Sequence, residues 1–235
     1  MSDAAEPTDW IGQPTSWKAH AGNADFLSRP RVSANSARLR ESRLKWLIDI
    51  FGAGIGLLIL LPFLLLIALL IVLESRGPIL FRQRRTGRDG AVFVIYKFRT
   101  MNVMEDGSKV IQATRKDNRV TRMGIFLRRS SIDELPQLIN VLKGDMSLVG
   151  PRPHAVAHDE CYAQMVADYR LRFHAKPGIT GLAQISGFRG EIRDIDHLRE
   201  RVAHDLDYIE KWSLKTDARI LLSTVISAPF NRCAY

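Results

Sequence analysis

The sequence predicts an α+β protein that combines a membrane-embedded re-entrant helix, a small mixed α/β cytosolic domain and interfacial amphipathic helices. The first observation is Trp46–Leu73, a run of 28 residues that contains one charge, Asp49, and one proline, Pro62. The second is that arginine and lysine flank this run on both sides. The third is that short alternating segments and stretches of helical period follow one another beyond the run, which indicates mixed secondary structure.

Composition divides the chain into three parts. Residues 1–37 are rich in Ala, Ser, Pro and Asn and show no sustained apolar period, so we expect a flexible tail without a cleaved secretory signal. Residues 38–75 contain a basic flank and the membrane helix. Residues 76–235 form the expected cytosolic domain, with interfacial helices toward its C-terminal end.

The charge of the chain is concentrated in one segment. The chain has 34 basic and 25 acidic residues, a net charge of +9, and residues 76–129 contain 14 of the basic and 4 of the acidic ones. This segment favours an anionic partner such as nucleic acid, lipid headgroups or a phosphorylated substrate. Nucleic acid is not expected, because helix-turn-helix, RNP-type and zinc-ligand patterns are absent from the sequence. Cys161 and Cys233 lack metal-ligand spacing and suit a reduced, cytoplasmic setting.

The length of the apolar run leaves its topology open, but its flanks favour a re-entrant helix. A straight helix of this length measures about 42 Å, against a hydrocarbon core of about 30 Å, and tilt can absorb the excess. Cationic residues favour the cytoplasmic face, and a helix broken at Pro62 that returns to its own face would keep both flanks there. A tilted spanning helix with a mild kink is the alternative. The flanking cations are Arg38, Arg40, Arg43 and Lys45 before the run, and Arg76, Arg82, Arg84, Arg85 and Arg88 after it.

The cytosolic part shows local signals for each of its elements. Ile79–Arg82 and Ala91–Arg99 alternate around a Gly-Arg-Asp-Gly turn, which predicts a β-hairpin. Residues 102–118 are polar and predict a loop or short helix, and residues 177–187 have the composition of turn and strand. Arg122–Arg129 is basic and amphipathic. Helices are expected at residues 133–144 with Gly144 as the stop, at His158–His174, at Ile195–Trp212 and at Leu214–Ile226.

Two neighbouring carboxylates, Asp133 and Glu134, stand in the basic stretch RRSSIDELPQL at residues 128–138. One interpretation is structural, because Ser131 and Glu134 have the S-x-x-E spacing of a capping box and Pro136 fits a first helical turn. The other interpretation is chemical, because adjacent carboxylates among cations at a helix start are suited to phosphate chemistry. The spacing by itself leaves both open.

Five stretches in a fixed order resemble the bacterial sugar transferases, the monotopic polyprenyl-phosphate phosphoglycosyl transferases. The resemblance covers the chain from about Lys45 to Asp217 and is greatest to the compact, exopolysaccharide-initiating members. The stretches are LKWLID at 44–49, YKFRTM at 96–101, SIDELPQLINVLKGDMSLVGPRP at 131–153, PGITG at 177–181, and DLDY at 205–208 with TDARI at 216–220.

The resemblance implies a reaction and its partners. A UDP-sugar would donate a sugar-1-phosphate to undecaprenyl or another polyprenyl phosphate and leave UMP, at the cytoplasmic face of the cytoplasmic membrane. Asp133 matches the family's nucleophile, which would form an aspartyl-phosphosugar, and Glu134 matches a ligand of Mg²⁺, for which Mn²⁺ is the expected substitute. The lipid bilayer is a further partner, and the C-terminal region leaves room for a homo-oligomer. A non-catalytic scaffold of polysaccharide assembly is the alternative.

Further residues match functional positions of the family. Lys97 and Arg152 match basic residues expected to contact the nucleotide diphosphate, and Asp217 matches a late acidic position that is counted with them. Arg128 is a fourth candidate for substrate binding, because its guanidinium precedes the carboxylate pair. The structural alternatives are a solvated strand residue for Lys97, a loop charge for Arg152 and a helix-start position for Asp217.

The membrane entrance has its own candidates. Lys45 and Asp49 match a basic and acidic pair there, with interfacial anchoring as the alternative, and Pro62 is the expected break in the helix. The chain also departs from the family's usual pattern after PGITG, because Gly187 is followed by Phe188 and the expected arginine comes one place later, at Arg189.

Overall fold

The computed structural model describes residues 34–102 and 117–227. Most of the tail expected at 1–37 therefore lies outside the described residues, and so does most of the polar stretch at 102–118. Residues 34–37 differ from the expected tail, because they open the helix α1, Ala34–Glu41.

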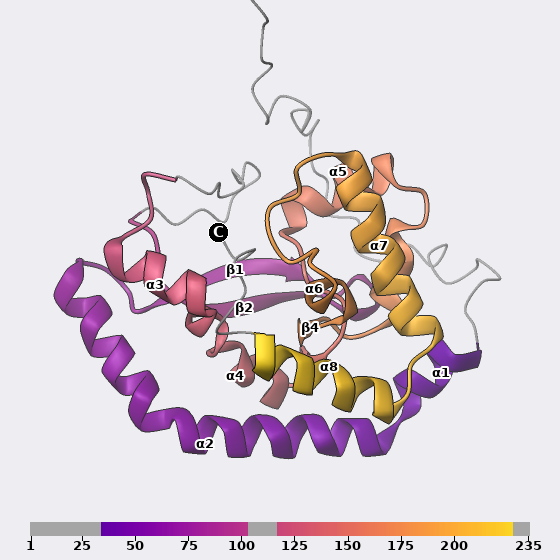
Figure 1. The fold of residues 1–235 in the computed structure, drawn as a ribbon, viewed down its shortest axis with the longest axis horizontal. Helices are drawn as coiled ribbons and strands as arrows, with labels where there is room; N and C mark the ends of the chain where they lie inside the picture. Colours follow the sequence, from indigo (N-terminus) through magenta and orange to yellow (C-terminus); the bar gives the residue numbers. More distant parts are fainter. Residues whose placement is uncertain (1–33, 103–116, 228–235) are drawn as a thin grey trace, which may run out of the picture.

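The longest element is α2, Arg43–Glu74, a helix of 32 residues that contains the apolar run. Ser42 caps its start, where Ser42 Oγ accepts a hydrogen bond from the backbone N–H of Lys45 at 3.2 Å. The helix extends beneath the rest of the protein and then bends upward toward its later end (Figure 1). Pro62 lies inside it, and proline is a usual cause of a bend because it removes a backbone donor. By length and composition this helix could cross a membrane.

The predicted β-hairpin is confirmed. Strands β1, Leu80–Thr86, and β2, Val92–Phe98, pair antiparallel along their whole length. The helix α4, Gln137–Leu142, packs against β2 through the buried side chain of Asn140. Asn140 Nδ2 donates to the carbonyl of Val94 at 2.7 Å, and Asn140 Oδ1 accepts from the N–H of Tyr96 at 3.0 Å. One amide thus satisfies two backbone groups of the strand.

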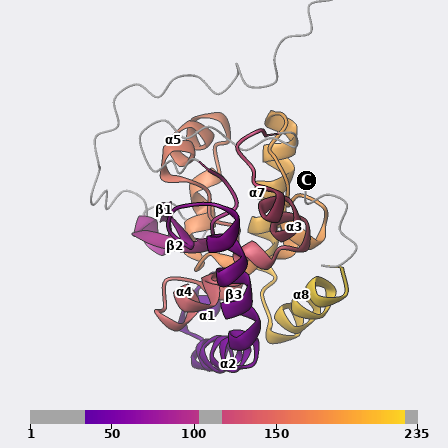
Figure 2. The same cartoon turned by 90° about the vertical axis from the view of Figure 1, so that its left-hand side faces the viewer.

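A second small sheet and several short helices complete the described part. Strands β3, Ser147–Val149, and β4, Gly178–Thr180, pair in parallel. In both ribbon views α4 and α8 lie just above α2 (Figures 1 and 2). The remaining helices are α3 Arg122–Ser130, α5 Val156–Met165, α6 Leu182–Ile185, α7 Ile195–Glu210 and α8 Leu214–Ser227, with 3₁₀ turns η2 Arg88–Gly90, η3 Ile132–Glu134 and η4 Tyr169–His174.

Two expected helices differ from those observed, whereas α7 and α8 begin at the predicted residues and the basic, amphipathic stretch at Arg122–Arg129 forms α3. The helix expected at His158–His174 is interrupted at Val166, which has the extended angles φ −126° and ψ 111°. The helix expected from residue 133 begins only at Gln137. The residue before it is Pro136, which has no N–H to continue a hydrogen-bonded turn.

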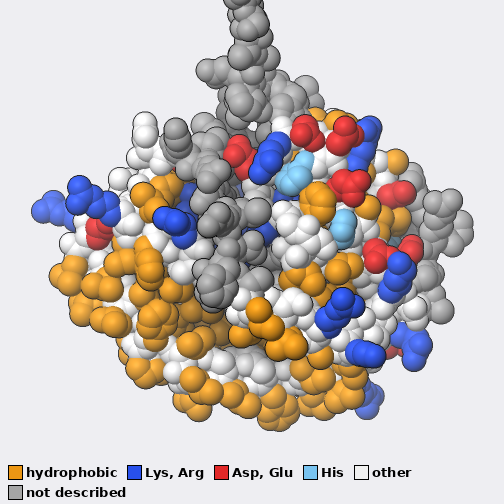
Figure 3. Space-filling view, in the orientation of Figure 1, with side chains coloured by type: hydrophobic (Ala, Val, Ile, Leu, Met, Phe, Trp, Pro, Cys, Tyr) orange, Lys and Arg blue, Asp and Glu red, His pale blue; other side chains and the backbone are white. Residues whose placement is uncertain are grey.

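Both halves of α2 pack against the same domain. Ala53 lies against Leu138 in one hydrophobic cluster, and Ile71 lies against Phe98 and Leu127 in another. The opposite face of α2 is apolar and exposed, with Leu58 and Leu73 each 73% exposed among many others. Figure 3 shows hydrophobic side chains along this lower face of the molecule.

Arg99 fastens the C-terminal end of α2 to the hairpin. Its Nη2 atom donates to the carbonyl oxygens of Ile71 at 3.3 Å and Ser75 at 2.5 Å, and to Ser75 Oγ at 2.9 Å. A cation at a helix C-terminus also meets the negative end of the helix dipole. Gly77, at φ 129°, leaves room for this contact, because a Cβ there would lie 2.3 Å from Arg99 Nη1.

Replacement of Arg99 should weaken the attachment of α2. We expect Arg99→Met to lower the free energy of unfolding by about 1.5–3 kcal/mol, since hydrogen bonds from a charged donor are lost. The measurement is the thermal unfolding midpoint of the purified protein in detergent. Arg76→Met is the matched control, because Arg76 is exposed beside the same helix end. Equal midpoints for the two variants would contradict this role of Arg99.

Candidate active site

Glu134 lies at the centre of a cluster of cationic side chains and is 5% exposed. Its Oε1 accepts hydrogen bonds from Lys97 Nζ at 2.8 Å and Arg152 Nη2 at 2.6 Å. Its Oε2 accepts from Arg152 Nη1 at 3.1 Å and Arg189 Nη2 at 3.0 Å. Burial favours a higher pKa for Glu134, but Arg152, Lys97 and Arg189 together hold the pKa well below its usual value. The three cations therefore favour the ionised form of this carboxylate.

The capping-box interpretation of Ser131 and Glu134 is wrong. Ser131 has a left-handed backbone, with φ 62°, and ends α3, and its side chain caps neither neighbouring helix. Within the described residues its hydroxyl has no hydrogen-bond partner. Glu134 faces the cations, as described above, and not the backbone N–H of Ser131. The chemical interpretation of the carboxylate pair is the one that agrees with this geometry.

Asp133 lies next to Glu134 in a different environment. It is 8% exposed, and no described residue gives its carboxylate a hydrogen bond or an ion pair. Burial, followed by the negative charge of Glu134, raises the pKa of Asp133 to about 6, although Lys97, Arg128 and Arg189 act in the opposite direction. Asp133 is thus a carboxylate with both oxygens uncommitted, surrounded by positive charge, and such groups are candidates for chemistry.

Three segments far apart in the sequence supply the cations around Glu134. Lys97 comes from β2, Arg152 from the loop after β3, and Arg189 from the loop between α6 and α7. The structure therefore brings the predicted residues Lys97 and Arg152 to the carboxylate pair, and Arg128 acts on Asp133 through its charge. Arg189 was not among the predicted site residues. The signal for Arg189 in the sequence is that an arginine follows the PGITG stretch one place later than in the family's usual pattern.

Two arginines hold the backbone of Arg152 and of the residue that follows it. Arg172 Nη2 donates to the carbonyl of Arg152 at 2.6 Å, and Arg85 Nη1 donates to the carbonyl of Pro153 at 3.2 Å. Arg172 is itself fixed by Asp205, whose Oδ2 accepts from Arg172 Nε at 2.7 Å. No local pattern indicates these roles of Arg85 and Arg172, because the carbonyls that they bind lie in a different segment of the chain.

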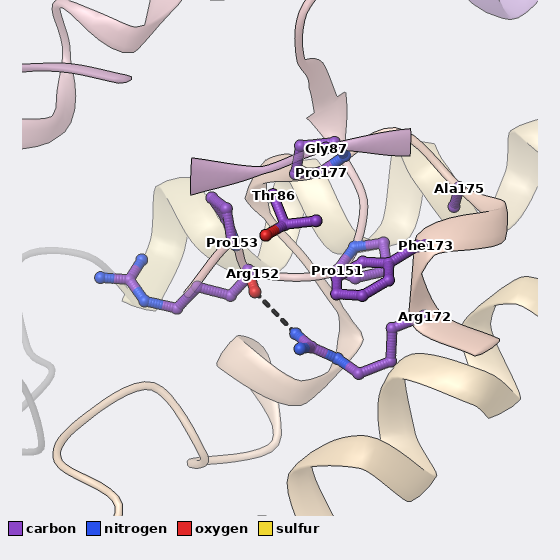
Figure 4. Close-up of a pocket in the computed structure, with 9 residues that line it drawn as sticks. All are labelled: Thr86, Gly87, Pro151, Arg152, Pro153, Arg172, Phe173, Ala175 and Pro177. Carbon is purple, nitrogen blue, oxygen red and sulfur yellow. Dashed lines mark hydrogen bonds between the residues drawn. The ribbon is translucent and has the colours of Figure 1, made fainter. Parts of the chain in front are cut away.

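The pocket in Figure 4 lies beside this loop and is separate from the carboxylate pair. Its lining includes Thr86, Gly87 and Pro177 together with the loop itself. Arg152 also borders the pocket, but its side chain extends away from Arg172 and the other lining residues (Figure 4). The backbone of this loop thus borders the pocket, whereas the guanidinium of Arg152 binds Glu134.

The candidates for the membrane entrance join Asp217 in a second cluster. Lys45 Nζ donates to Asp217 Oδ2 at 2.7 Å and to the carbonyl of Val149 at 3.2 Å. Asp49 Oδ2 accepts from Ser147 Oγ at 2.7 Å. These contacts fasten the start of α2 to β3 and α8. The structure thus places Asp217 with Lys45 and not with the cations around Glu134, and Pro62 lies apart from both clusters, on the exposed face of α2. The substrate and entrance roles of these residues stay predictions.

The carboxylate pair fits a magnesium ion only in combination with other ligands. The part of the chain that the structure describes contains no group of three or more His, Cys, Asp or Glu side chains that could hold a metal. Magnesium at phosphate sites is commonly held by one or two carboxylates, with substrate phosphates and water as the other ligands. Asp133 and Glu134 can supply that share, so the donor set suits an ion that binds together with a phosphorylated substrate.

Comparison with known proteins agrees with this site. The family described as bacterial sugar transferase matches residues 40–230. A UDP-glucose:undecaprenyl-phosphate glucose-1-phosphate transferase of Caulobacter vibrioides is 55% identical over 220 residues, which cover 94% of this chain and 82% of that protein. The exopolysaccharide production protein PSS of Rhizobium leguminosarum bv. phaseoli is 47% identical over 188 residues, covering 78% of this chain and 94% of that protein.

Other relatives are longer than this chain. The Escherichia coli (strain K12) protein that bears the same name as the Caulobacter relative is 52% identical over 187 residues. The match covers 80% of this chain and 40% of the E. coli protein. Because the family match covers most of the chain and includes the carboxylate pair and its cations, the chain belongs to the bacterial sugar transferase family.

Proposed function

We propose that the chain transfers glucose-1-phosphate from UDP-glucose to undecaprenyl phosphate, as the first membrane step of exopolysaccharide or related glycan synthesis. The uncommitted carboxylate of Asp133, next to the cation-bound Glu134, is the observation that carries the reaction class. Glucose is chosen because it stands in the name of the Caulobacter relative, at 55% identity over 94% of this chain. An Aeromonas hydrophila relative named for N-acetylgalactosamine is 42% identical.

The proposed reaction has two steps at one phosphorus. An Asp133 oxygen attacks the β-phosphorus of the donor, the bond to the bridging oxygen breaks, and UMP leaves. A phosphate oxygen of undecaprenyl phosphate then attacks the same phosphorus, which forms the diphosphate product and restores the Asp133 carboxylate. The intermediate is a mixed acyl phosphate, whose reactivity resembles that of the anhydride it replaces, so one difficult step becomes two easier ones.

The cations make the first attack feasible. Two unit negative charges 4 Å apart repel by about 4 kcal/mol at an effective dielectric constant of 20, so the diphosphate must be neutralised before a carboxylate can approach it. Lys97, Arg152 and Arg189 would do this, and the planar fork of arginine matches phosphate oxygens. Glu134 would hold Mg²⁺, or Mn²⁺ as a substitute, and a bound divalent ion supplies further neutralisation of phosphate charge.

We further propose that α2 enters and leaves the membrane on its cytoplasmic face. A straight helix of 32 residues would be about 48 Å long, so a domain on one side of the bilayer would reach one end of it only. The same domain contacts both ends of α2. Asp217 binds Lys45 at the start of the helix, and Arg99 binds the backbone at its C-terminal end. The exposed apolar face of α2 and that of α8, where Val225 is 72% exposed, would then lie in the lipid interface.

Loss of the proposed nucleophile should abolish the first step. We expect Asp133→Asn to lower Mg²⁺-dependent UMP release from UDP-glucose by at least about a thousandfold, because nucleophile removal has effects of this size or larger in other enzymes. Asp196→Asn is the control, since Asp196 is an exposed carboxylate at the start of α7. Mass spectrometry of the parent chain with donor and without acceptor should find the adduct on Asp133.

Two outcomes would contradict the assignment. Release of UMP by Asp133→Asn at the parental rate would mean that another group is the nucleophile. Absence of Mg²⁺-dependent UMP release from the parent chain, with any of a panel of UDP-sugars, would instead favour a non-catalytic scaffold.

The rate of the first step should depend on the ionisation of Asp133. With the pKa raised to about 6, the carboxylic acid form predominates below that pH and cannot attack. Single-turnover UMP release without acceptor should therefore rise with pH and reach half its maximum near pH 6. The acceptor is left out because its phosphate monoester titrates in the same range, at a pKa of about 6. A rate that stays constant down to pH 5 would contradict the raised pKa.

The topology can be tested with single cysteines at the two flanks of α2. Glu41→Cys and Arg76→Cys, each in a chain that lacks Cys161 and Cys233, place exposed thiols on either side of the helix. For a re-entrant helix, an impermeant maleimide should label both thiols in inside-out membrane vesicles and neither in right-side-out ones. Labelling of the two positions from opposite sides would show a spanning helix.

A further inference from the structure

The carboxylate of Glu134 occupies the position at which its three cations would otherwise bind a phosphate group. It accepts four hydrogen bonds of 2.6–3.1 Å from Lys97, Arg152 and Arg189. Two of these come from the guanidinium fork of Arg152, and that fork binds carboxylates and phosphates with the same bidentate geometry. While the N–H groups of these cations donate hydrogen bonds to Glu134, they cannot donate the same hydrogen bonds to a substrate.

An incoming anion has to compete with Glu134 for the three cations, because the hydrogen bonds between them are shielded from water. The side chains of all four residues are mostly buried, so solvent screening between them is weak. The cations favour the ionised form of Glu134, as described above. Asp133, at the adjacent position, binds none of them.

We propose that Glu134 is an internal competitor of the donor: its carboxylate holds Lys97, Arg152 and Arg189 in place, and the donor diphosphate displaces it from them on binding. This inference rests on the proposed function, because it takes the donor to be a nucleoside diphosphate sugar. The same exchange releases the oxygens of Glu134 for a divalent ion. Metal and donor should therefore bind together, with little binding of the metal alone.

The test measures binding of UDP, without chemistry and without metal. Isothermal titration calorimetry in EDTA is performed on the full chain in detergent, with Glu134→Gln and Glu134→Asp as variants. Glu134→Gln removes the competing charge and should bind UDP about tenfold or more tightly, which corresponds to about 1.4 kcal/mol or more. Glu134→Asp keeps the charge but is one methylene shorter, so it loses contacts with the cations and should show a smaller increase in affinity in the same direction.

A matched control separates this effect from a general change of charge. Asp117→Asn also removes an ion-paired carboxylate, but its partner is Arg119 and not a cation around Glu134, so UDP should not bind more tightly to this variant. If both Glu134 variants bind UDP no more tightly than the parent chain, Glu134 is not a competitor and the inference is wrong. Absence of UDP binding by every protein, the parent chain included, both in EDTA and with saturating Mg²⁺, would overturn the proposed function together with this inference.

A second measurement needs no variant and therefore does not depend on how the substitutions fold. Protein-bound Mn²⁺ is counted by electron paramagnetic resonance after ultrafiltration of the parent chain, with and without saturating UDP. We expect at least about a tenfold rise in apparent Mn²⁺ affinity when UDP is present. Equal Mn²⁺ affinity in the two conditions would overturn the linked exchange.

Discussion

The four hydrogen bonds to the buried carboxylate of Glu134 are the interaction on which the site depends. They join Glu134 to residues that lie 37, 18 and 55 positions away from it in the sequence, one in a strand and two in loops. Three mostly buried cations repel one another, and burial of a charge without a partner costs several kcal/mol. One central anion offsets this cost and orders the cations, while the neighbouring Asp133 stays uncommitted. Two identical functional groups thus acquire different properties from their surroundings alone.

The position of Arg152 shows how this order extends outward. Its backbone is held by Arg172, which is in turn fixed by the buried carboxylate of Asp205 on α7. Prolines on both sides of Arg152 restrict the loop further. The guanidinium that binds Glu134 is therefore placed by a chain of buried contacts that ends in a long helix. Hydrogen bonds from residues behind a site, such as those of Arg172 and Asp205, help to keep its functional groups in a fixed position.

Local sequence patterns were sufficient for much of the fold. The alternation in β1 and β2 around a Gly-rich turn, and the helical periods of α7 and α8, depend on near neighbours in the chain and were predicted correctly. The break between α5 and η4 was not predicted, because Val166 is neither glycine nor proline and its extended backbone depends on tertiary packing. The order of motifs likewise located the carboxylate pair and two of its cations.

Long-range electrostatics explain what the sequence left undetermined. Ser131 and Glu134 have the spacing of a capping box, but the carboxylate of Glu134 binds three cations from distant segments instead of a backbone N–H. Arg189 occupies a position shifted by one residue relative to the usual pattern, so only the fold shows that it reaches Glu134. The pairing of Lys45 with Asp217 spans 172 positions, and no local pattern encodes such a contact.

The attachment of α2 at both ends has a consequence for lipid dependence. A helix held at one end adapts to bilayers of different thickness by tilting. In the proposed re-entrant topology, α2 is held at both ends by the same domain and would lack this freedom, so lipids would have to rearrange around it to absorb a mismatch. The depth of the carboxylate pair relative to the acyl chains would then be set by the protein and would stay constant from one membrane composition to another.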